Sequence, residues 1–158
     1  MLQVFRSLPV ASAVYRADTL PATARTYARD TVTLGWEERL KGRSRRRSDS
    51  GVEFATTLPR GTVLREGDCL VLDAHTLVVT VVERGEPVFV VEPRTAEEWG
   101  LYGYLIGNSH QPVMLIDGAI VCPDVPGMEQ VLTQHDINFS RATRPFTPVS
   151  LLLDHRHA

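Results

Sequence analysis

The sequence predicts an α+β protein in which a small all-β half precedes a half of alternating strands and helices. Up to about residue 84, short runs of alternating polar and apolar residues are separated by turns rich in glycine and proline, as in small all-β domains. Beyond it the expected order is strand, helix, strand, strand, helix, strand, the ferredoxin-like βαββαβ arrangement. We therefore expect a β-rich domain at 1–84, a ferredoxin-like domain at 85–148 and a flexible histidine-containing tail at 149–158.

Five short strands are expected in the first half. They are bounded by turn residues such as Pro59, Gly61 and Gly67. The expected strands are residues 31–34, 51–55, 62–64, 69–72 and 76–82. His75 lies in the turn between the last two strands, and we expect it to be a plain solvated residue.

A basic stretch at residues 39–47 interrupts this pattern. It holds six of the 17 lysines and arginines, and such clusters attract phosphates. Glu37 and Glu38 precede it, however, and it contains no aromatic residue that stacks on a base. We interpret it as an exposed strand end and hairpin loop, suited to docking an acidic partner.

The second half opens with a compact apolar strand at residues 87–91. Thr95 followed three residues later by Glu98 is the pattern of a capping box, so a helix is expected from Thr95 to about Ile106. Gly107 and Asn108 both tolerate the left-handed conformation and are expected to end this helix.

A hairpin and a second helix complete the expected order. Asp117 and Gly118 form a hairpin turn signal between strands at 112–116 and 119–122. Asp124 or Val125 is expected to cap the second helix, with Pro126 in its first turn. The last strand is expected at residues 137–143.

The composition bounds the class of protein. Of the residues, 43% are hydrophobic, yet no apolar run reaches about 18 residues, so we expect no membrane span. The formal charge of -2 argues against bulk attraction to nucleic acid or membrane, and residues 1–10 lack the apolar core of a signal peptide. Cys69 and Cys122 match no zinc or redox spacing and are expected to be buried free thiols in a reducing cytoplasm.

No motif of catalysis is present. The chain has no glycine-rich phosphate loop, no nucleophile elbow and no His-Glu-x-x-His pair. We therefore expect that the protein is not an enzyme.

Three of the five histidines lie in two places. His110 lies in the turn at residues 107–112, and His155 and His157 lie in the tail. Imidazole suits nickel, copper and zinc. One imidazole on a loop is a poor metal site, but an imidazole shared with a symmetry mate and joined by flexible tail histidines makes a usable one. His135, at a helix end, fits a favourable interaction with the helix dipole better than a metal site.

Several segments resemble the urease accessory protein E (UreE) family. Residues 104–112, Tyr-Leu-Ile-Gly-Asn-Ser-His-Gln-Pro, resemble its Gly-Asn-Arg-His-x-Pro signature. Residues 144–148 are similar to the segment that closes the family's second domain. The first half is similar to its first domain in order and spacing, at residues 30–34, 38–43, 51–53 and 58–68. The resemblance covers roughly residues 25–148.

The resemblance implies a cytoplasmic, homodimeric metallochaperone that delivers Ni²⁺ to apo-urease during urease maturation. It implies that His110 binds nickel where two copies of the second domain meet, and His155 and His157 match the family's C-terminal ligands in kind. Zn²⁺ or Cu²⁺ is expected to bind the same ligands in vitro. The implied partners are the urease accessory GTPase, the other assembly factors and apo-urease, contacted through the first domain, with no nucleic acid and no membrane.

The chain also departs from the family pattern. Ser109 replaces the usual arginine, and residues 123–126 lack the histidine that often begins the second helix. With only two tail histidines, the chain is expected to act as a carrier and not as a metal store. Two alternatives stay open: a metal-independent peptide-binding or assembly module that uses an edge strand of the first domain, and an RNA-binding protein that uses residues 39–47.

Overall fold

The computed structural model describes residues 7–149 and shows a mixed α/β chain, mostly sheet, with three α-helices in that range. Contacts between residues divide the chain into two compact units, Met1–Arg84 and Gly85–Ala158. Within the described range no helix is long and apolar enough to cross a bilayer.

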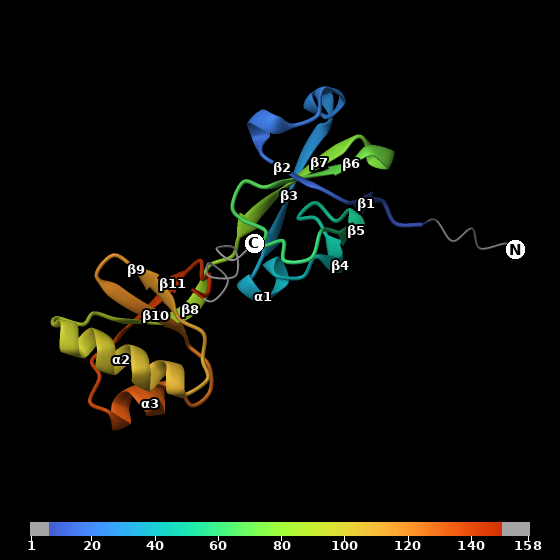
Figure 1. Ribbon diagram of the computed structural model, residues 1–158. Coiled ribbons are helices and arrows are strands. Elements are labelled where there is room, and N and C mark those ends of the chain that lie inside the picture. The colour runs from blue at the N-terminus through green and yellow to red at the C-terminus, as the bar shows by residue number, and fades with distance from the viewer. Residues whose placement is uncertain (1–6, 150–158) are drawn as a thin grey trace, which may run out of the picture. The chain divides into compact units, whose positions relative to one another are not determined.

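Two sheets build the first unit (Figure 1). One has the order β1-β5-β4, in which β5 pairs parallel to β1 and antiparallel to β4. The other has the order β2-β6-β7-β3, and only its β7–β3 pair is parallel. The strands are β1 (Val10–Ala11), β2 (Val14–Tyr15), β3 (Ala28–Leu34), β4 (Arg43–Arg47), β5 (Glu53–Thr57), β6 (Cys69–Leu72) and β7 (Leu77–Glu83).

Short helical turns join these strands, and a main apolar cluster and a smaller second one lie among them. The turns are η1 (Ala17–Thr19), η2 (Ala22–Thr26), η3 (Asp73–His75) and the single-turn helix α1 (Trp36–Arg39). Val32 of β3, Phe54 of β5 and Val81 of β7 are buried in the same cluster. β-branched and aromatic side chains of this kind favour a pleated, half-buried surface.

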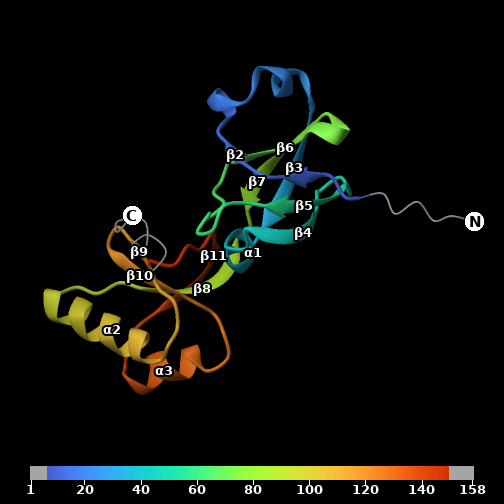
Figure 2. The same cartoon turned by 45° about the vertical axis from the view of Figure 1, so that its right-hand side comes forward.

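The second unit is one antiparallel sheet with the order β11-β8-β10-β9. Helix α2 (Ala96–Asn108) connects β8 to β9, and α3 (Met128–Gln134) connects β10 to β11. Figures 1 and 2 show both helices on one face of the sheet. Phe89, Ile106 and Leu132 meet in the core between them. The strands are β8 (Glu86–Val91), β9 (Met114–Ile116), β10 (Ala119–Pro123) and β11 (Ser140–Arg144).

The expected strand at residues 62–64 is wrong, because this segment joins no sheet of the described chain. Leu64 is fully buried. Its backbone N–H donates to the carbonyl of Arg39 at 3.0 Å. The apolar alternation in this segment therefore reflects the burial of one loop side chain and not a pleated strand.

The interpretation of residues 39–47 as an exposed strand end and loop is also wrong. Arg39 ends α1, and Arg43–Arg47 form the strand β4. Arg39 and Arg46 are buried. Arg46 donates to the carbonyls of Glu38 and Lys41 at the end of α1, so two of the six basic residues in this stretch serve the interior.

The boundaries of the second unit's elements differ from expectation. Asp124 and Val125 do not cap the second helix: α3 begins at Met128, and Gly127 at φ +88° is its cap. The last strand begins at Ser140 and not at residue 137, since Ile137 is buried in the helix-facing core. Prolines and glycines indicated that a turn was near, but not which residue would adopt the left-handed conformation.

Candidate functional site

His110 lies in the turn that follows α2. Gly107 and Asn108, expected to end the helix, belong to it, and His110 is the residue with positive φ, at +58°. Histidine adopts this conformation more readily than most side chains do. The backbone N–H of His110 donates to the carbonyl of Gly107 at 3.0 Å, so the backbone alone holds the residue in place.

The imidazole of His110 is exposed and makes no hydrogen bond, ion pair or ring contact within residues 7–149. The end of α2 is closed instead by Ser109. Its backbone N–H and its hydroxyl both donate to the carbonyl of Ile106, and its oxygen lies 3.9 Å from the sulfur of Met128. Ser109 thus closes the end of the helix, and the neighbouring imidazole is open to solvent.

The N-terminal end of α2 is fixed by Thr95 and Glu98. The Thr95 hydroxyl accepts a hydrogen bond from the N–H of Glu98 at 3.1 Å, which confirms the predicted cap. The return bond differs from the usual capping box, because the Glu98 carboxylate accepts from the N–H of Arg94, one residue before the cap, at 2.6 Å. Ile106 is buried against the sheet, so both ends of the helix position the turn that carries His110.

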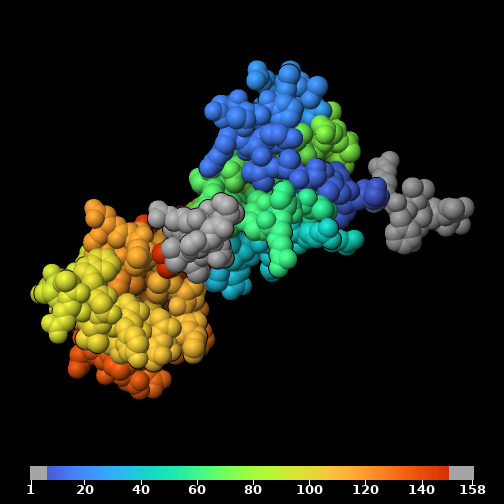
Figure 3. All heavy atoms as spheres, in the orientation of Figure 1, coloured from blue at the N-terminus to red at the C-terminus, as the bar shows by residue number. Residues whose placement is uncertain are grey.

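The outer side of α2 is open. A Cβ added to Gly100, Gly103 or Gly107 would meet nothing within 4 Å. Leu101 is 50% exposed and Tyr104 is 67% exposed, and Figure 3 shows the atoms of α2 in yellow at the surface of the second unit. Glycine within a helix costs about 1 kcal/mol relative to alanine. No contact of these glycines within the described chain compensates for this cost.

The described part of one chain does not assemble a complete metal site. No group of three His, Cys, Asp or Glu side chains in residues 7–149 is placed to hold an ion. His75 in η3 and His135 after α3 are exposed and belong to no such group, and His155 and His157 lie outside the described residues. A metal ion at His110 would therefore need ligands from outside this part of one chain.

The two cysteines are buried free thiols, as expected. Burial, and then the negative charge of Asp124, raises the pKa of Cys122 to about 12. Cys122 also belongs to no group of three potential metal ligands within residues 7–149.

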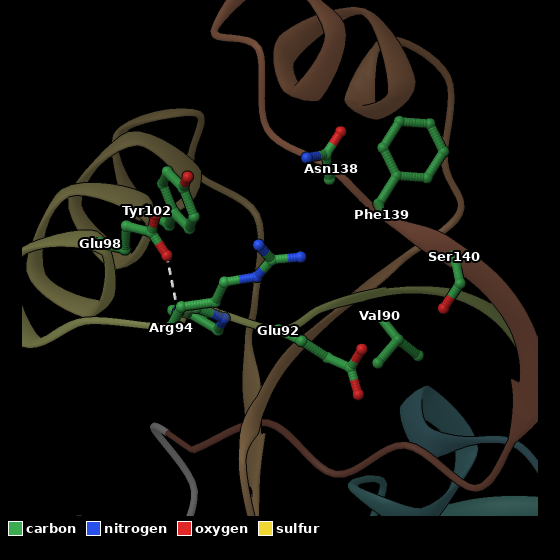
Figure 4. Close-up of a pocket in the computed structure, with 9 residues that line it drawn as sticks. Val90, Glu92, Arg94, Glu98, Tyr102, Asn138, Phe139 and Ser140 are labelled. Carbon is green, nitrogen blue, oxygen red and sulfur yellow. Dashed lines mark hydrogen bonds between the residues drawn. The ribbon is translucent and has the colours of Figure 1, made fainter.

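The second unit also has an open hollow of about 510 Å³ that the sequence did not predict. Figure 4 shows Arg94, Glu98 and Tyr102 on one side of it and Asn138 and Ser140 on the other. The two sides come from distant parts of the sequence, at residues 94–102 and 138–140. No local sequence pattern therefore predicts the hollow. It lies at the start of α2, about 18 Å along the helix from its other end, and it has neither histidine nor cysteine in its lining.

Comparisons with known proteins agree on one family. Residues 14–83 match the family described as UreE urease accessory protein, N-terminal domain. The urease accessory protein UreE of Burkholderia thailandensis is 38% identical over 127 residues, which cover 80% of this chain and 59% of that protein. The protein of the same name from Streptococcus vestibularis is 33% identical over 114 residues, or 72% of this chain and 75% of the relative. That from Burkholderia mallei is 36% identical over 139 residues, 88% of this chain and 66% of the relative. The chain thus spans less than two thirds of the two Burkholderia proteins.

Proposed function

Because this chain belongs to the UreE family of urease accessory proteins, we propose that it carries Ni²⁺ and delivers it to apo-urease during urease maturation. The relatives are named as urease accessory proteins. As a member of their family, this chain is an accessory protein and not an enzyme. In the proposal, His110 of two chains holds the ion at a homodimer interface.

The observation that carries the proposal is the exposed imidazole of His110 on a backbone fixed by α2. A ligand for a transferable metal has to be accessible, and it has to be free of hydrogen bonds that compete with the ion. One imidazole per chain becomes two where a two-fold axis passes close to it. Neutral imidazole suits Ni²⁺, and Zn²⁺ or Cu²⁺ can occupy the same ligands.

The open face of α2 supports the homodimer. Leu101 and Tyr104 expose apolar area on α2, which ends two residues before His110. The glycines on this helix leave space for the backbone of a second copy. The strand order β11-β8-β10-β9, with both helices on one face, supports assigning the second unit to the ferredoxin-like arrangement. We assign dimerisation and metal binding to this unit, residues 85–148.

The tail and the first unit have separate roles in the proposal. His155 and His157 add ligands from residues 149–158, and metal leaves by ligand exchange because the site is open to solvent. Residues 1–84 contact the urease accessory GTPase, the other assembly factors and apo-urease. The place of action in this proposal is the cytoplasm.

A delivery assay tests this function. The nickel-loaded chain is mixed with apo-urease and the assembly factors in a buffer that holds a weak chelator, and urease activity is followed. Activation is expected with the parent and strongly reduced with His110→Gly. Equal activation by both proteins, or by the parent without nickel, would favour the metal-independent assembly module instead.

A further inference from the structure

The outer face of β4 carries three arginines that the nickel proposal does not use. Arg43, Arg45 and Arg47 are exposed, whereas Ser44 and Arg46 between them are not. Successive side chains of a strand point to opposite faces, so the three arginines share one face at intervals of about 7 Å. They are called the arginine row below.

The arginine row lacks internal partners. Within residues 7–149, Arg43 and Arg45 make neither an ion pair nor a hydrogen bond through their side chains, and Arg47 makes one long bond of 3.4 Å from Nε to the carbonyl of Gly51. Arg46, on the opposite face, donates to Lys41 and Glu38 carbonyls and to the Thr56 hydroxyl. One arginine therefore anchors the strand while its neighbours present uncompensated charge.

The strand that carries the row is an edge. β4 pairs with β5 on one side, and no strand of the described chain pairs with its other side. Across the sheet from the row lie Glu53, Ala55 and Thr57, and Val10 of β1 pairs with Ala55 and is 52% exposed. The face therefore combines an open strand edge, a row of positive charge and a small apolar surface.

We propose that β4 binds an extended acidic segment of a partner protein, which adds a strand at this edge and places carboxylates on alternate residues beside the arginine row. Strand addition supplies backbone hydrogen bonds, and pockets or charges at alternate positions supply specificity. Residues directly opposite each other on neighbouring strands have Cβ atoms about 4.5–5.5 Å apart, so oppositely charged side chains there can form an ion pair. This binding does not require nickel or His110, since it belongs to the other unit.

A protein segment fits this face better than nucleic acid does. The row has no aromatic side chain on which bases stack. The free edge also offers backbone donors and acceptors in the pattern that a strand satisfies.

Fluorescence anisotropy with the full-length protein tests the proposal. The probe is a labelled octapeptide of alternating Glu and Val, and the control peptide has Gln in place of each Glu. Each exposed ion pair contributes a factor of about two to affinity, so removing all three arginines is expected to weaken probe binding about tenfold. The row variant is Arg43→Gln, Arg45→Gln, Arg47→Gln, and the control with the same charge loss elsewhere is Arg25→Gln, Arg29→Gln, Arg94→Gln.

The control variant is expected to bind as the parent does, and the Gln peptide is expected to bind at least tenfold more weakly than the probe. Equal binding of both peptides, or equal binding by the row variant and the parent, would overturn the proposal. So would a single-stranded RNA of the same charge that binds more tightly than the probe through the same arginines. If circular dichroism shows that the row variant is unfolded, Arg45→Gln alone is measured, with an expected loss of about twofold.

Discussion

His110 is linked to Gly107 by a backbone hydrogen bond of 3.0 Å, and this bond accompanies a left-handed backbone at φ +58°. The residue therefore has two separable properties. Its backbone closes the turn after α2, while its imidazole is left for solvent or metal. Substitutions that change one property and spare the other can test its role.

His110→Gly and His110→Ala are both expected to remove the tightest nickel site. Glycine adopts positive φ without steric cost, whereas alanine pays about 1 kcal/mol there. We therefore expect the glycine variant to be at least as stable as the parent and the alanine variant to be slightly less stable. Urea unfolding and nickel dialysis measure the two effects. Tight nickel binding by the glycine variant would exclude His110 as the ligand, and His75→Ala and His135→Ala serve as controls that keep the site.

Deleting residues 154–158 is expected to weaken nickel binding without changing the stability of the metal-free protein. An imidazole has to lose its proton before it binds metal. The difference between full-length and truncated protein should therefore be clear at about pH 7.5 and vanish near about pH 5.5, on either side of the usual imidazole pKa of about 6.5. Calorimetric titration at both pH values measures it. If truncation leaves the affinity at the higher pH unchanged, His155 and His157 are not ligands.

Two arginine substitutions within residues 39–47 are expected to change the free energy of unfolding by very different amounts. Arg39 is 1% exposed and pairs with Glu83 at 3.1 Å, and it also donates to the carbonyl of Leu64. Removing one member of a buried pair costs about 3–5 kcal/mol, so Arg39→Ala should lower the free energy of unfolding strongly. Arg45→Ala, on the exposed face of β4, should change it by less than about 0.5 kcal/mol. Similar losses in urea unfolding for both variants would contradict this assignment of burial.

Cys122 is expected to make stability depend on alkaline pH. Burial first, and then Asp124, raises its pKa from 9.0 to about 12. Because the folded state holds this proton more tightly than the unfolded state, the stabilisation is present below about pH 9 and is lost as the pH rises toward 12.

The control for this effect is Cys122→Ala, which removes the titrating thiol. Between about pH 9 and about pH 10.5, the parent's free energy of unfolding should fall more steeply than the variant's, by up to about 1.4 kcal/mol per pH unit. Parallel curves in urea unfolding would show that Cys122 is not the group responsible.

Local patterns predicted the elements that depend on neighbouring residues. The expected strand at 69–72 coincides with β6, and Asp117 and Gly118 form the turn between β9 and β10. Thr95 caps α2 as expected. In each case residues within one turn or one strand set the conformation, so the sequence contains the necessary information locally.

The features that the sequence did not predict depend on residues far along the chain. Arg39 is buried because Glu83, 44 residues later, lies beside it, and a run of charges gives no sign of such a partner. Gly107 and Asn108 stay helical because His110, and neither of them, adopts the left-handed conformation that ends the turn. For the metal site the sequence identified one accessible imidazole, but its other proposed ligands belong to residues 150–158 or to a second copy, beyond the described part of one chain.

Nickel stoichiometry tests the central claim most directly. A calorimetric titration of the purified chain, read together with its mass in solution, counts tight ions per assembled molecule. A site formed by His110 from two chains predicts one tight nickel ion per dimer, and His110→Gly should lose that ion while remaining a dimer. One tight ion per chain in a protein that stays monomeric would contradict the shared site.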